Sequence, residues 1–268
     1  MRSRRGGTDM KENLLKKRLA GGEAVLGLME SNITPNLVEL YGLLGFDFII
    51  FDTEHGNNAK EDCENLIRAA ECAGYTPLIR VEDNARVPIL RALDLGAGGI
   101  IVPMVETPED GRQCVDRAKY FPLGSRGLST STRAASYGVR GETSDYVRQA
   151  NAEILVAVQI ETQTAVDHLE GLLALEGVDI YYIGPSDLSQ SMGYPGQKRY
   201  PQVQDVIAET VGRITRAGRV AGIQCGGMDD VRRYYEMGAR FLSCSSHSIA
   251  KPAYLDFLRN FRALSQRG

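Results

Sequence analysis

The stretch from residue 48 to residue 56 reads Phe48-Ile49-Ile50-Phe51-Asp52-Thr53-Glu54-His55-Gly56, an apolar run that ends in acids and a histidine. Four consecutive apolar residues are typical of a strand that is buried on both faces of a parallel sheet. Polar residues directly after such a strand lie at its carboxyl end, where α/β folds carry their chemistry. His55 is one of only three histidines, so few side chains titrate near neutral pH. This segment is the first candidate for a functional site.

The same alternation of a short apolar run and an amphipathic stretch recurs along the chain. Eight runs are predicted strands, at residues 25–29, 48–51, 77–81, 99–103, 154–160, 180–183, 220–223 and 240–244. Helical patterns lie between them, at residues 59–73, 87–95, 108–119, 162–175, 202–217, 228–237 and 249–264. Eight strand–helix units in a chain of 268 residues predict an α/β protein with a (β/α)8 barrel.

A doubly wound sheet is the alternative α/β fold. It is disfavoured because no GxGxxG loop follows the first predicted strand and the chain has no Walker lysine. We expect one barrel domain at residues 11–268, preceded by a disordered tail at residues 1–10. Residues 122–150 form a long excursion after the fourth unit, and we expect them to build a loop over the barrel mouth.

The composition argues against several classes of partner. Charged residues make up 24% of the chain and the net charge is −3, which gives no reason to expect nucleic acid or an anionic membrane as a partner. No apolar run approaches the roughly 20 residues that span a bilayer. The five cysteines are scattered and form no CxxC pair, so we expect reduced thiols and a cytoplasmic protein.

Polar side chains at the ends of the predicted strands would share one site at the barrel mouth. Glu161 and Asp187 follow neighbouring strands, and two such carboxylates can hold a hard divalent cation whose other ligands are water or substrate oxygens. Oxygen-only ligation favours Mg²⁺ or Mn²⁺, and Co²⁺ would also fit. Arg80 would pair with a substrate carboxylate or a developing oxyanion. His55, oriented by Asp52, would act as a base near neutral pH.

These residues also have structural interpretations. Asp187 and Glu161 precede predicted helices and could be capping residues, although an acid after a buried strand needs a cation or a donor to offset its burial. Arg80 could instead be an ion-pair partner of Asp52 or Glu54.

Three more residues could have either a structural or a functional role. His55 could be a loop histidine, and His247, at the end of the eighth predicted strand, could line the mouth. Asp94, on a helix ahead of Gly96, is by itself more typical of a solvated or capping acid than of a catalytic one.

Six short segments stand in a fixed order along the chain, at residues 51–55, 79–80, 93–97, 102–107, 159–162 and 183–189. They read Phe-Asp-Thr-Glu-His, Ile-Arg, Leu-Asp-Leu-Gly-Ala, Val-Pro-Met-Val-Glu-Thr, Gln-Ile-Glu-Thr and Ile-Gly-Pro-Ser-Asp-Leu-Ser. Together they resemble the HpcH/HpaI family of class II pyruvate aldolases, which includes hydroxy-oxo-heptanedioate aldolase, 2-keto-3-deoxy-sugar-acid aldolases and macrophomate synthase. The resemblance runs from about residue 25 to the last helix.

The resemblance implies a TIM barrel of the phosphoenolpyruvate/pyruvate type and a metal-dependent lyase. The reaction would be the reversible cleavage of a 4-hydroxy-2-oxo acid to pyruvate and an aldehyde, through a metal-stabilised pyruvate enolate. Glu161 and Asp187 would be the metal ligands, and Arg80 would hold pyruvate and stabilise its enolate. His55 with Asp52 would be the base assembly, acting directly or through a metal-bound water.

Further roles follow from the same resemblance. Asp94 would be an acid that reaches the neighbouring subunit's site and partners the histidine there. Substrate contacts would come from Gln159, Gly184, Pro185 and Ser186. The chain would form a homo-oligomer, a trimer or a hexamer, in which the helix from about residue 249 is swapped between barrels.

Other reactions of the same enolate remain open alternatives, namely oxaloacetate decarboxylation or a macrophomate-synthase-like reaction. An acyl-CoA lyase or a noncatalytic barrel that binds keto acids is less favoured. The segment at residues 125–138 keeps arginine-glycine and arginine-alanine elements of the family but carries an unusual Ser-Thr-Ser-Thr run, and Thr53 stands where many members have glycine. Arg126 or Arg133 could hold a distal acid of the substrate or could anchor the loop by an ion pair.

Overall fold

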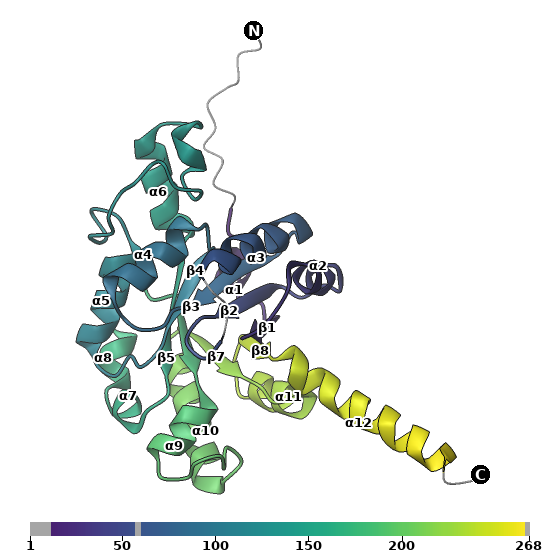
Figure 1. Ribbon diagram of the computed structural model, residues 1–268. Helices are drawn as coiled ribbons and strands as arrows, with labels where there is room; N and C mark the ends of the chain where they lie inside the picture. The colour runs from purple at the N-terminus through teal and green to yellow at the C-terminus, as the bar shows by residue number, and fades with distance from the viewer. Residues whose placement is uncertain (1–11, 57–59, 266–268) are drawn as a thin grey trace.

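Eight parallel strands close into a barrel in the computed structural model, which describes residues 12–56 and 60–265 (Figure 1). Each strand pairs with the next along the chain, and β8 pairs with β1 to complete the ring. The predicted (β/α)8 barrel and all eight predicted strands are confirmed, with small shifts at the strand ends. The strands are β1 (Val25–Glu30), β2 (Phe48–Asp52), β3 (Thr76–Arg80), β4 (Gly99–Val102), β5 (Leu155–Ile160), β6 (Ile180–Ile183), β7 (Val220–Gln224) and β8 (Phe241–Cys244).

Helices connect the strands and cover the barrel from outside (Figure 1). The predicted helical segments are confirmed, and the sequence patterns missed α1, α2, α6 and α9. The helices are α1 (Leu14–Ala20), α2 (Pro35–Leu43), α3 (Lys60–Ala73), α4 (Arg86–Asp94), α5 (Pro108–Ala118), the 3₁₀ turn η1 (Ser136–Gly138), α6 (Thr143–Glu153), α7 (Gln163–Asp167), α8 (Leu169–Leu173), α9 (Pro185–Ser191), α10 (Pro201–Arg216), α11 (Met228–Glu236) and α12 (Ser246–Ser265).

Two segments differ from the sequence prediction. Residues 162–175 form α7 and α8 rather than one helix, because His168 at the junction has φ −94° and ψ 10°, outside the helical region. The predicted loop at residues 122–150 contains η1 and most of α6. The predicted disordered tail at residues 1–10 lies outside the described residues.

Apolar side chains pack in two layers, one inside the barrel and one between the barrel and its helices. Inside, the rings of Phe48 and Phe241 stack with centroids 4.1 Å apart. Gly27 makes room for them, since a Cβ on this residue would lie 2.5 Å from the Phe48 ring. Such close packing of buried strands explains why the strands read as continuous apolar runs.

Helix α1 closes the amino end of the barrel. Its Leu15 and Leu19 join the inner apolar layer. The amide of Asn13, which caps the helix, donates to the carbonyl of Gly98 just before β4 (2.9 Å). The opposite, carboxyl end is therefore the open mouth where polar residues can meet a substrate.

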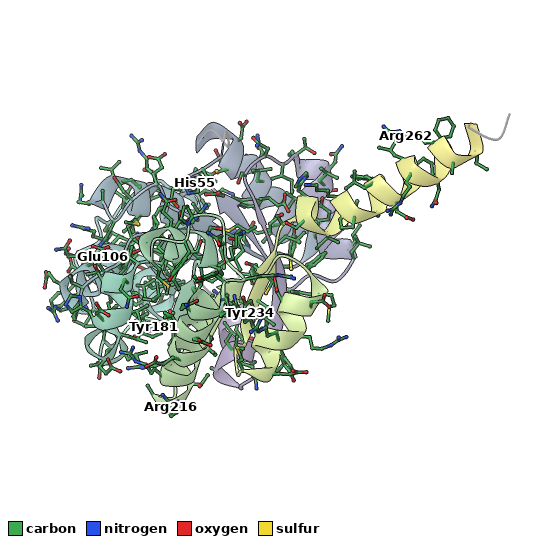
Figure 2. The ribbon with its side chains drawn as sticks, turned by 90° about the horizontal axis from the view of Figure 1, so that it is seen from below. His55, Glu106, Tyr181, Arg216, Tyr234 and Arg262 are labelled. Atoms are coloured by element: carbon green, nitrogen blue, oxygen red, sulfur yellow. The ribbon has the colours of Figure 1, made fainter. Side chains whose placement is uncertain are left out.

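Helix α12 extends away from the barrel (Figures 1 and 2). Its start is fixed to the end of β1, where Glu30 accepts bonds from the amide (2.6 Å) and hydroxyl (2.9 Å) of Ser246. Beyond that point its apolar side chains are exposed, including Phe257 (75%) and Phe261 (62%). Among the described residues, no helix is long and apolar enough to cross a membrane.

We expect Phe241→Ala to lower the free energy of unfolding by about 3–5 kcal/mol, because it leaves a cavity beside Phe48 in the barrel interior. Urea denaturation of the variant and the wild type measures the difference. Val139→Ala, at a position that is 78% exposed, is the control and should change stability by less than about 0.5 kcal/mol. A similar small change for Phe241→Ala would contradict the packing described here.

Candidate active site

Most of the predicted site residues lie together at the carboxyl end of the barrel. The strands that carry them end at the mouth that α1 leaves open, and the side chains at these strand ends are largely buried. The residues are Asp52 at the end of β2, Arg80 at the end of β3, Gln159 and Glu161 at the end of β5, and Gly184, Pro185, Ser186 and Asp187 between β6 and the first turn of α9.

A buried ion pair joins Arg80 to Asp52. The barrel register places the two residues opposite each other. The Arg80 Nε donates to Asp52 Oδ1 (2.9 Å) and Nη2 donates to Oδ2 (2.6 Å), which is a bidentate arrangement. Asp52 also accepts a bond from the Ser31 hydroxyl (2.9 Å). The ion-pair interpretation that the sequence left open for Arg80 is therefore present in the structure.

The pair keeps both groups charged. Burial by itself would raise the pKa of Asp52, but the hydrogen bonds and positive charge of Arg80 outweigh it and hold the pKa below its usual value. Burial likewise opposes the charge of Arg80, and Asp52 and Glu54 raise its pKa instead. The guanidinium is thus a fixed positive charge at the mouth.

Glu54 is a second carboxylate on the same guanidinium. Its Oε2 lies 3.0 Å from Arg80 Nη1. Burial raises the pKa of Glu54, and the negative charges of Asp52 and Asp187 act in the same direction. Glu54 was not among the predicted catalytic residues, although its place directly after Thr53 in the opening stretch is the signal that could have found it.

His55 differs from the prediction in its contacts. Asp52 Oδ1 accepts a bond from the main-chain amide of His55 (3.3 Å) and so holds its backbone rather than its ring. The ring is 60% exposed, and its Nε2 lies 3.9 Å from Glu54 Oε2. The base candidate therefore stands at the solvent edge of the mouth, with Glu54 as the carboxylate beside it.

Asp94 lies at the end of α4 and is paired within this chain. Arg126 Nη2 donates to its Oδ1 (2.7 Å). The other loop arginine, Arg133, pairs with Glu71 on α3 and donates to the carbonyl of Leu95 (3.1 Å). Of the two roles left open for these arginines, the structure shows the anchoring of the loop. It does not bring Asp94 into contact with His55 of the same chain.

Glu161 is a buried acid with few donors. Its Oε1 accepts a bond from the main-chain amide of Met104 (2.8 Å), and Gln159 donates to Oε2. Burial, together with the negative charges of Asp187 and Glu54, raises its pKa to about 7. Met104 has φ 53°, an unusual conformation for a residue other than glycine, and its amide contacts the acid directly.

Gly184 fits against these two side chains. A Cβ on this residue would lie 2.8 Å from Glu161 Oε2 and 3.0 Å from Gln159 Nε2. A larger residue would push the two side chains apart, so the end of β6 needs glycine here.

The capping interpretations of the two acids are not supported. Thr162, not Glu161, caps α7, and its hydroxyl accepts a bond from the amide of Ala165 (3.1 Å). Gly184 occupies the cap position of α9, and Asp187 lies within the first turn without a side-chain capping bond. Both carboxylates remain available for another partner.

The donor set fits a hard divalent cation. Four carboxylates lie at the mouth: Asp52 and Glu54 interact with the Arg80 guanidinium, and Glu161 interacts with Asp187 and Glu54. No cluster of three or more histidine, cysteine, aspartate or glutamate ligands occurs in residues 12–56 and 60–265. Glu161 and Asp187 would therefore supply two ligands and leave the remaining positions to water and substrate.

Comparisons with known proteins identify the family of this chain. The family model for HpcH/HpaI aldolase/citrate lyase matches residues 27–251. The 2-keto-3-deoxy-L-rhamnonate aldolase of Escherichia coli (strain K12) is 36% identical over 245 residues, which is 91% of either chain.

Solved structures of the same family share the fold. An HpcH/HpaI aldolase/citrate lyase family protein from Burkholderia cenocepacia J2315 is 33% identical with a TM-score of 0.88, over 93% of this chain and 99% of that one. The HpcH/HpaI aldolase from Desulfitobacterium hafniense DCB-2 is 32% identical with a TM-score of 0.85, over 92% of this chain and 96% of that one. The chain therefore belongs to the HpcH/HpaI aldolase/citrate lyase family and is, by that membership, a carbon–carbon lyase.

Proposed function

We propose that this enzyme is a divalent-cation-dependent pyruvate aldolase that reversibly cleaves a 4-hydroxy-2-oxo acid to pyruvate and an aldehyde. One observation carries the proposal. A buried arginine, fixed by Asp52 and Glu54, shares the barrel mouth with Glu161 and Asp187, two carboxylates that have no cationic partner among the described residues. A 2-oxo acid presents a carboxylate and a keto oxygen, and such a site can bind both.

Glu161 and Asp187 would hold the cation, which we propose to be Mg²⁺, Mn²⁺ or Co²⁺. When bound, such a cation polarises a keto carbonyl and stabilises the negative charge of an enolate. The raised pKa of Glu161 supports this assignment, because a cation would offset the like charges that surround the acid.

Arg80 has donors left for the substrate. A guanidinium has about five N–H groups. The hydrogen bonds to Asp52 use one on Nε and one on Nη2, and Glu54 Oε2 lies 3.0 Å from Nη1 as an ion-pair partner without a hydrogen bond. The remaining N–H groups are one on Nη2 and those on Nη1. Because the ion pairs hold the group rigidly, these donors can meet the negative oxygen of the enolate without reorganisation.

Proton transfer at the pyruvate methyl group falls to His55. Its ring lies at the edge of the mouth, with Nε2 3.9 Å from Glu54 Oε2. Gln159 and the backbone of Gly184, Pro185 and Ser186 would position the substrate. Asp94 would act in the neighbouring subunit's site, as the resemblance implies.

We also propose that the chain is a homo-oligomer, a trimer or a hexamer, in the cytoplasm. Helix α12 has 20 residues, and helices in proteins owe most of their stability to the packing of an apolar face. Its exposed apolar residues Tyr254, Phe257, Leu258 and Phe261 recur at the spacing of one helix face. That face can be buried against the barrel of a second copy.

Pyruvate methyl protons should exchange with deuterium in the presence of Mg²⁺, Mn²⁺ or Co²⁺ and not in excess chelator. Arg80→Ala should slow this exchange about 100-fold, because it removes donors to the enolate oxygen. Proton NMR in deuterated water measures the rate without an aldehyde. Arg112→Ala, on the exposed face of α5, is the control.

Exchange that persists in chelator would contradict the cation dependence. Pyruvate release from oxaloacetate, compared in the same preparation with cleavage of 4-hydroxy-2-oxo acids, would reveal a decarboxylase instead.

Cation affinity should depend on pH through Glu161. Its pKa of about 7 means that a proton must be displaced at lower pH, so the apparent Mn²⁺ affinity should rise about tenfold per pH unit up to about pH 7 and level off above it. Titration of Mn²⁺ followed by electron paramagnetic resonance gives the affinity. In Glu161→Gln the affinity should fall and this pH dependence should vanish, whereas Glu109→Gln, at an exposed position, should match the wild type. A flat profile for the wild type would oppose the assignment.

Phe257→Asp should shift the protein to smaller species in sedimentation velocity, since it places a charge on the exposed apolar face of α12. Asn260→Asp adds the same charge on the polar side of the same helix and serves as the control. A wild-type protein that sediments as a monomer at micromolar concentration would refute the oligomer.

A further inference from the structure

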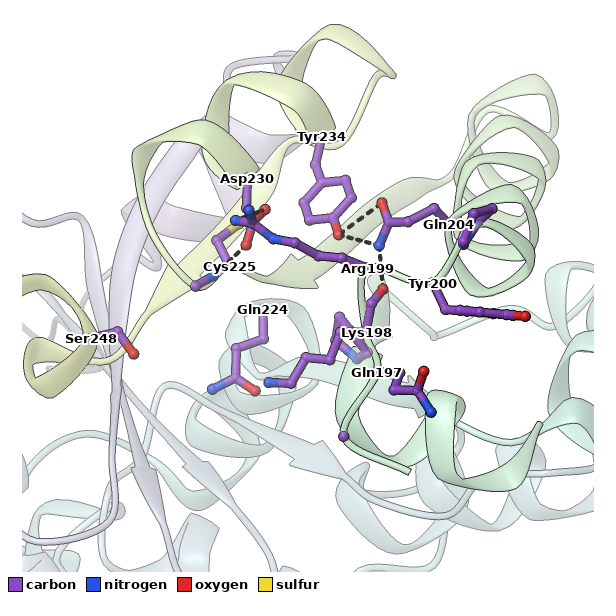
Figure 3. A pocket seen from close by; sticks show the side chains of 14 residues that line it. Gln197, Lys198, Arg199, Tyr200, Gln204, Gln224, Cys225, Asp230, Tyr234 and Ser248 are labelled. Carbon is purple, nitrogen blue, oxygen red and sulfur yellow. Dashed lines mark hydrogen bonds and ion pairs between the residues drawn. The ribbon is translucent and has the colours of Figure 1, made fainter. Parts of the chain in front are cut away.

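A cavity of about 570 Å³ opens beside the candidate active site (Figure 3). The segment between α9 and α10 forms one wall, and the carboxyl end of β7 forms another. Pro185, at the start of α9, lines the cavity and also lies two residues before Asp187. The size is typical of a small-molecule site, roughly 300–1,000 Å³, and exceeds what three-carbon pyruvate needs.

The barrel register connects the cavity to the pyruvate site. Ile183 of β6 pairs with Ile223 of β7, so the next residues, Gly184 and Gln224, follow side by side at the mouth. Gly184 packs against Glu161, and Gln224 lines the cavity. The cavity therefore lies on the side of β6 toward which a substrate longer than pyruvate would extend.

The charged residues that line the cavity leave one positive charge without a partner. They are Lys198, Arg199 and Asp230. Arg199 Nη2 lies 3.2 Å from Asp230 Oδ1, which neutralises both. Within residues 12–56 and 60–265, the Lys198 ammonium makes no hydrogen bond or ion pair. Figure 3 shows the side chains of Lys198 and Gln224 projecting into the hollow, where both can donate hydrogen bonds.

We propose that this cavity binds the distal end of the aldehyde half of the substrate, and that this end carries an anionic group, a carboxylate or a phosphate, held by Lys198 and Gln224. The proposal rests on the proposed function for the other end of the substrate. An ammonium and an amide together favour an anion over a neutral hydroxyl, because the ammonium attracts the opposite charge and the amide donates a stronger hydrogen bond to an ionised acceptor.

The two ends of the substrate would then be distinguished by charge. Arg80 receives the 2-oxo acid at one end of the site, and Lys198 receives the distal anion at the other. The carboxylates Glu54, Glu161 and Asp187 lie toward the first end. They repel a second anion from that end, so the arrangement orients the substrate as well as binding it.

The test compares aldehydes that differ only in their distal group. Condensation with pyruvate is measured for succinic semialdehyde against 4-hydroxybutanal, and for glyceraldehyde 3-phosphate against glyceraldehyde. For the wild type we expect kcat/KM to favour the anionic member of at least one pair by about tenfold or more. Which pair shows the larger ratio tells a carboxylate site from a phosphate site.

Lys198→Gln should reduce that ratio toward one, and Lys198→Glu should reverse it. The effect should lie mainly in KM for the aldehyde, because the reacting atoms are not touched. Lys17→Gln is the control, since Lys17 is an exposed residue of α1 at the opposite end of the barrel. A ratio that is the same in the wild type and in Lys198→Gln would overturn the proposal.

A binding measurement without catalysis distinguishes a failure of the anion site from a failure of the aldolase assignment. Succinate and inorganic phosphate are titrated by calorimetry into chelator-treated wild type and Lys198→Gln. Loss of binding in the variant supports the anion site even if the wild type shows no proton exchange, in which case the aldolase assignment alone fails. Equal binding by both proteins, or by neither, overturns the anion site even if exchange is normal.

Discussion

The candidate active site depends on the buried ion pair between Arg80 and Asp52. Removing two charges from water is costly, and the attraction between them offsets that cost only when the geometry is good and other hydrogen bonds complete the set. Here the contact is bidentate, and Ser31 and two main-chain amides also donate to Asp52. The barrel register places the two residues opposite each other. Backbone pairing deep in the fold therefore fixes the direction in which the guanidinium presents its remaining donors.

The same ion pair determines where negative charge is left over. Asp52 is satisfied by Arg80, whereas the donors to Glu161 in the part of the chain that the structure describes are the Met104 amide and Gln159. The raised pKa of Glu161 reflects burial near Asp187 and Glu54. The part of the mouth around Asp52 and Arg80 is therefore neutralised. The part around Glu161 lacks a compensating positive charge. A cation and an anionic substrate together complement this pattern better than either does alone.

The sequence predicts those features that depend on local patterns. Strands β2, β5 and β6 are largely apolar because they are buried on both faces, and polar residues at the ends of such runs must lie at the mouth. Partners across the fold are harder to predict. Asp52 could have oriented the His55 ring or paired with Arg80, and only the register decides. Asp94 has a partner in Arg126, 32 residues away, and no sequence spacing indicates it. The course of α12 is not indicated by local spacing either, because its apolar side chains are exposed in this chain.

The residues of the two halves of the proposed substrate site lie on different parts of the fold. Arg80, Glu161 and Gln159 lie on or next to barrel strands whose positions are fixed by hydrogen bonds on both sides. Lys198 and Arg199 lie on the connection between α9 and α10, outside the barrel. In the proposed site, a change in that connection would alter what the cavity binds without moving the residues that would meet the 2-oxo acid. Loops evolve more freely than the strands they join. On this proposal the enolate chemistry is tied to the barrel, and the choice of aldehyde is tied to a segment that can change independently.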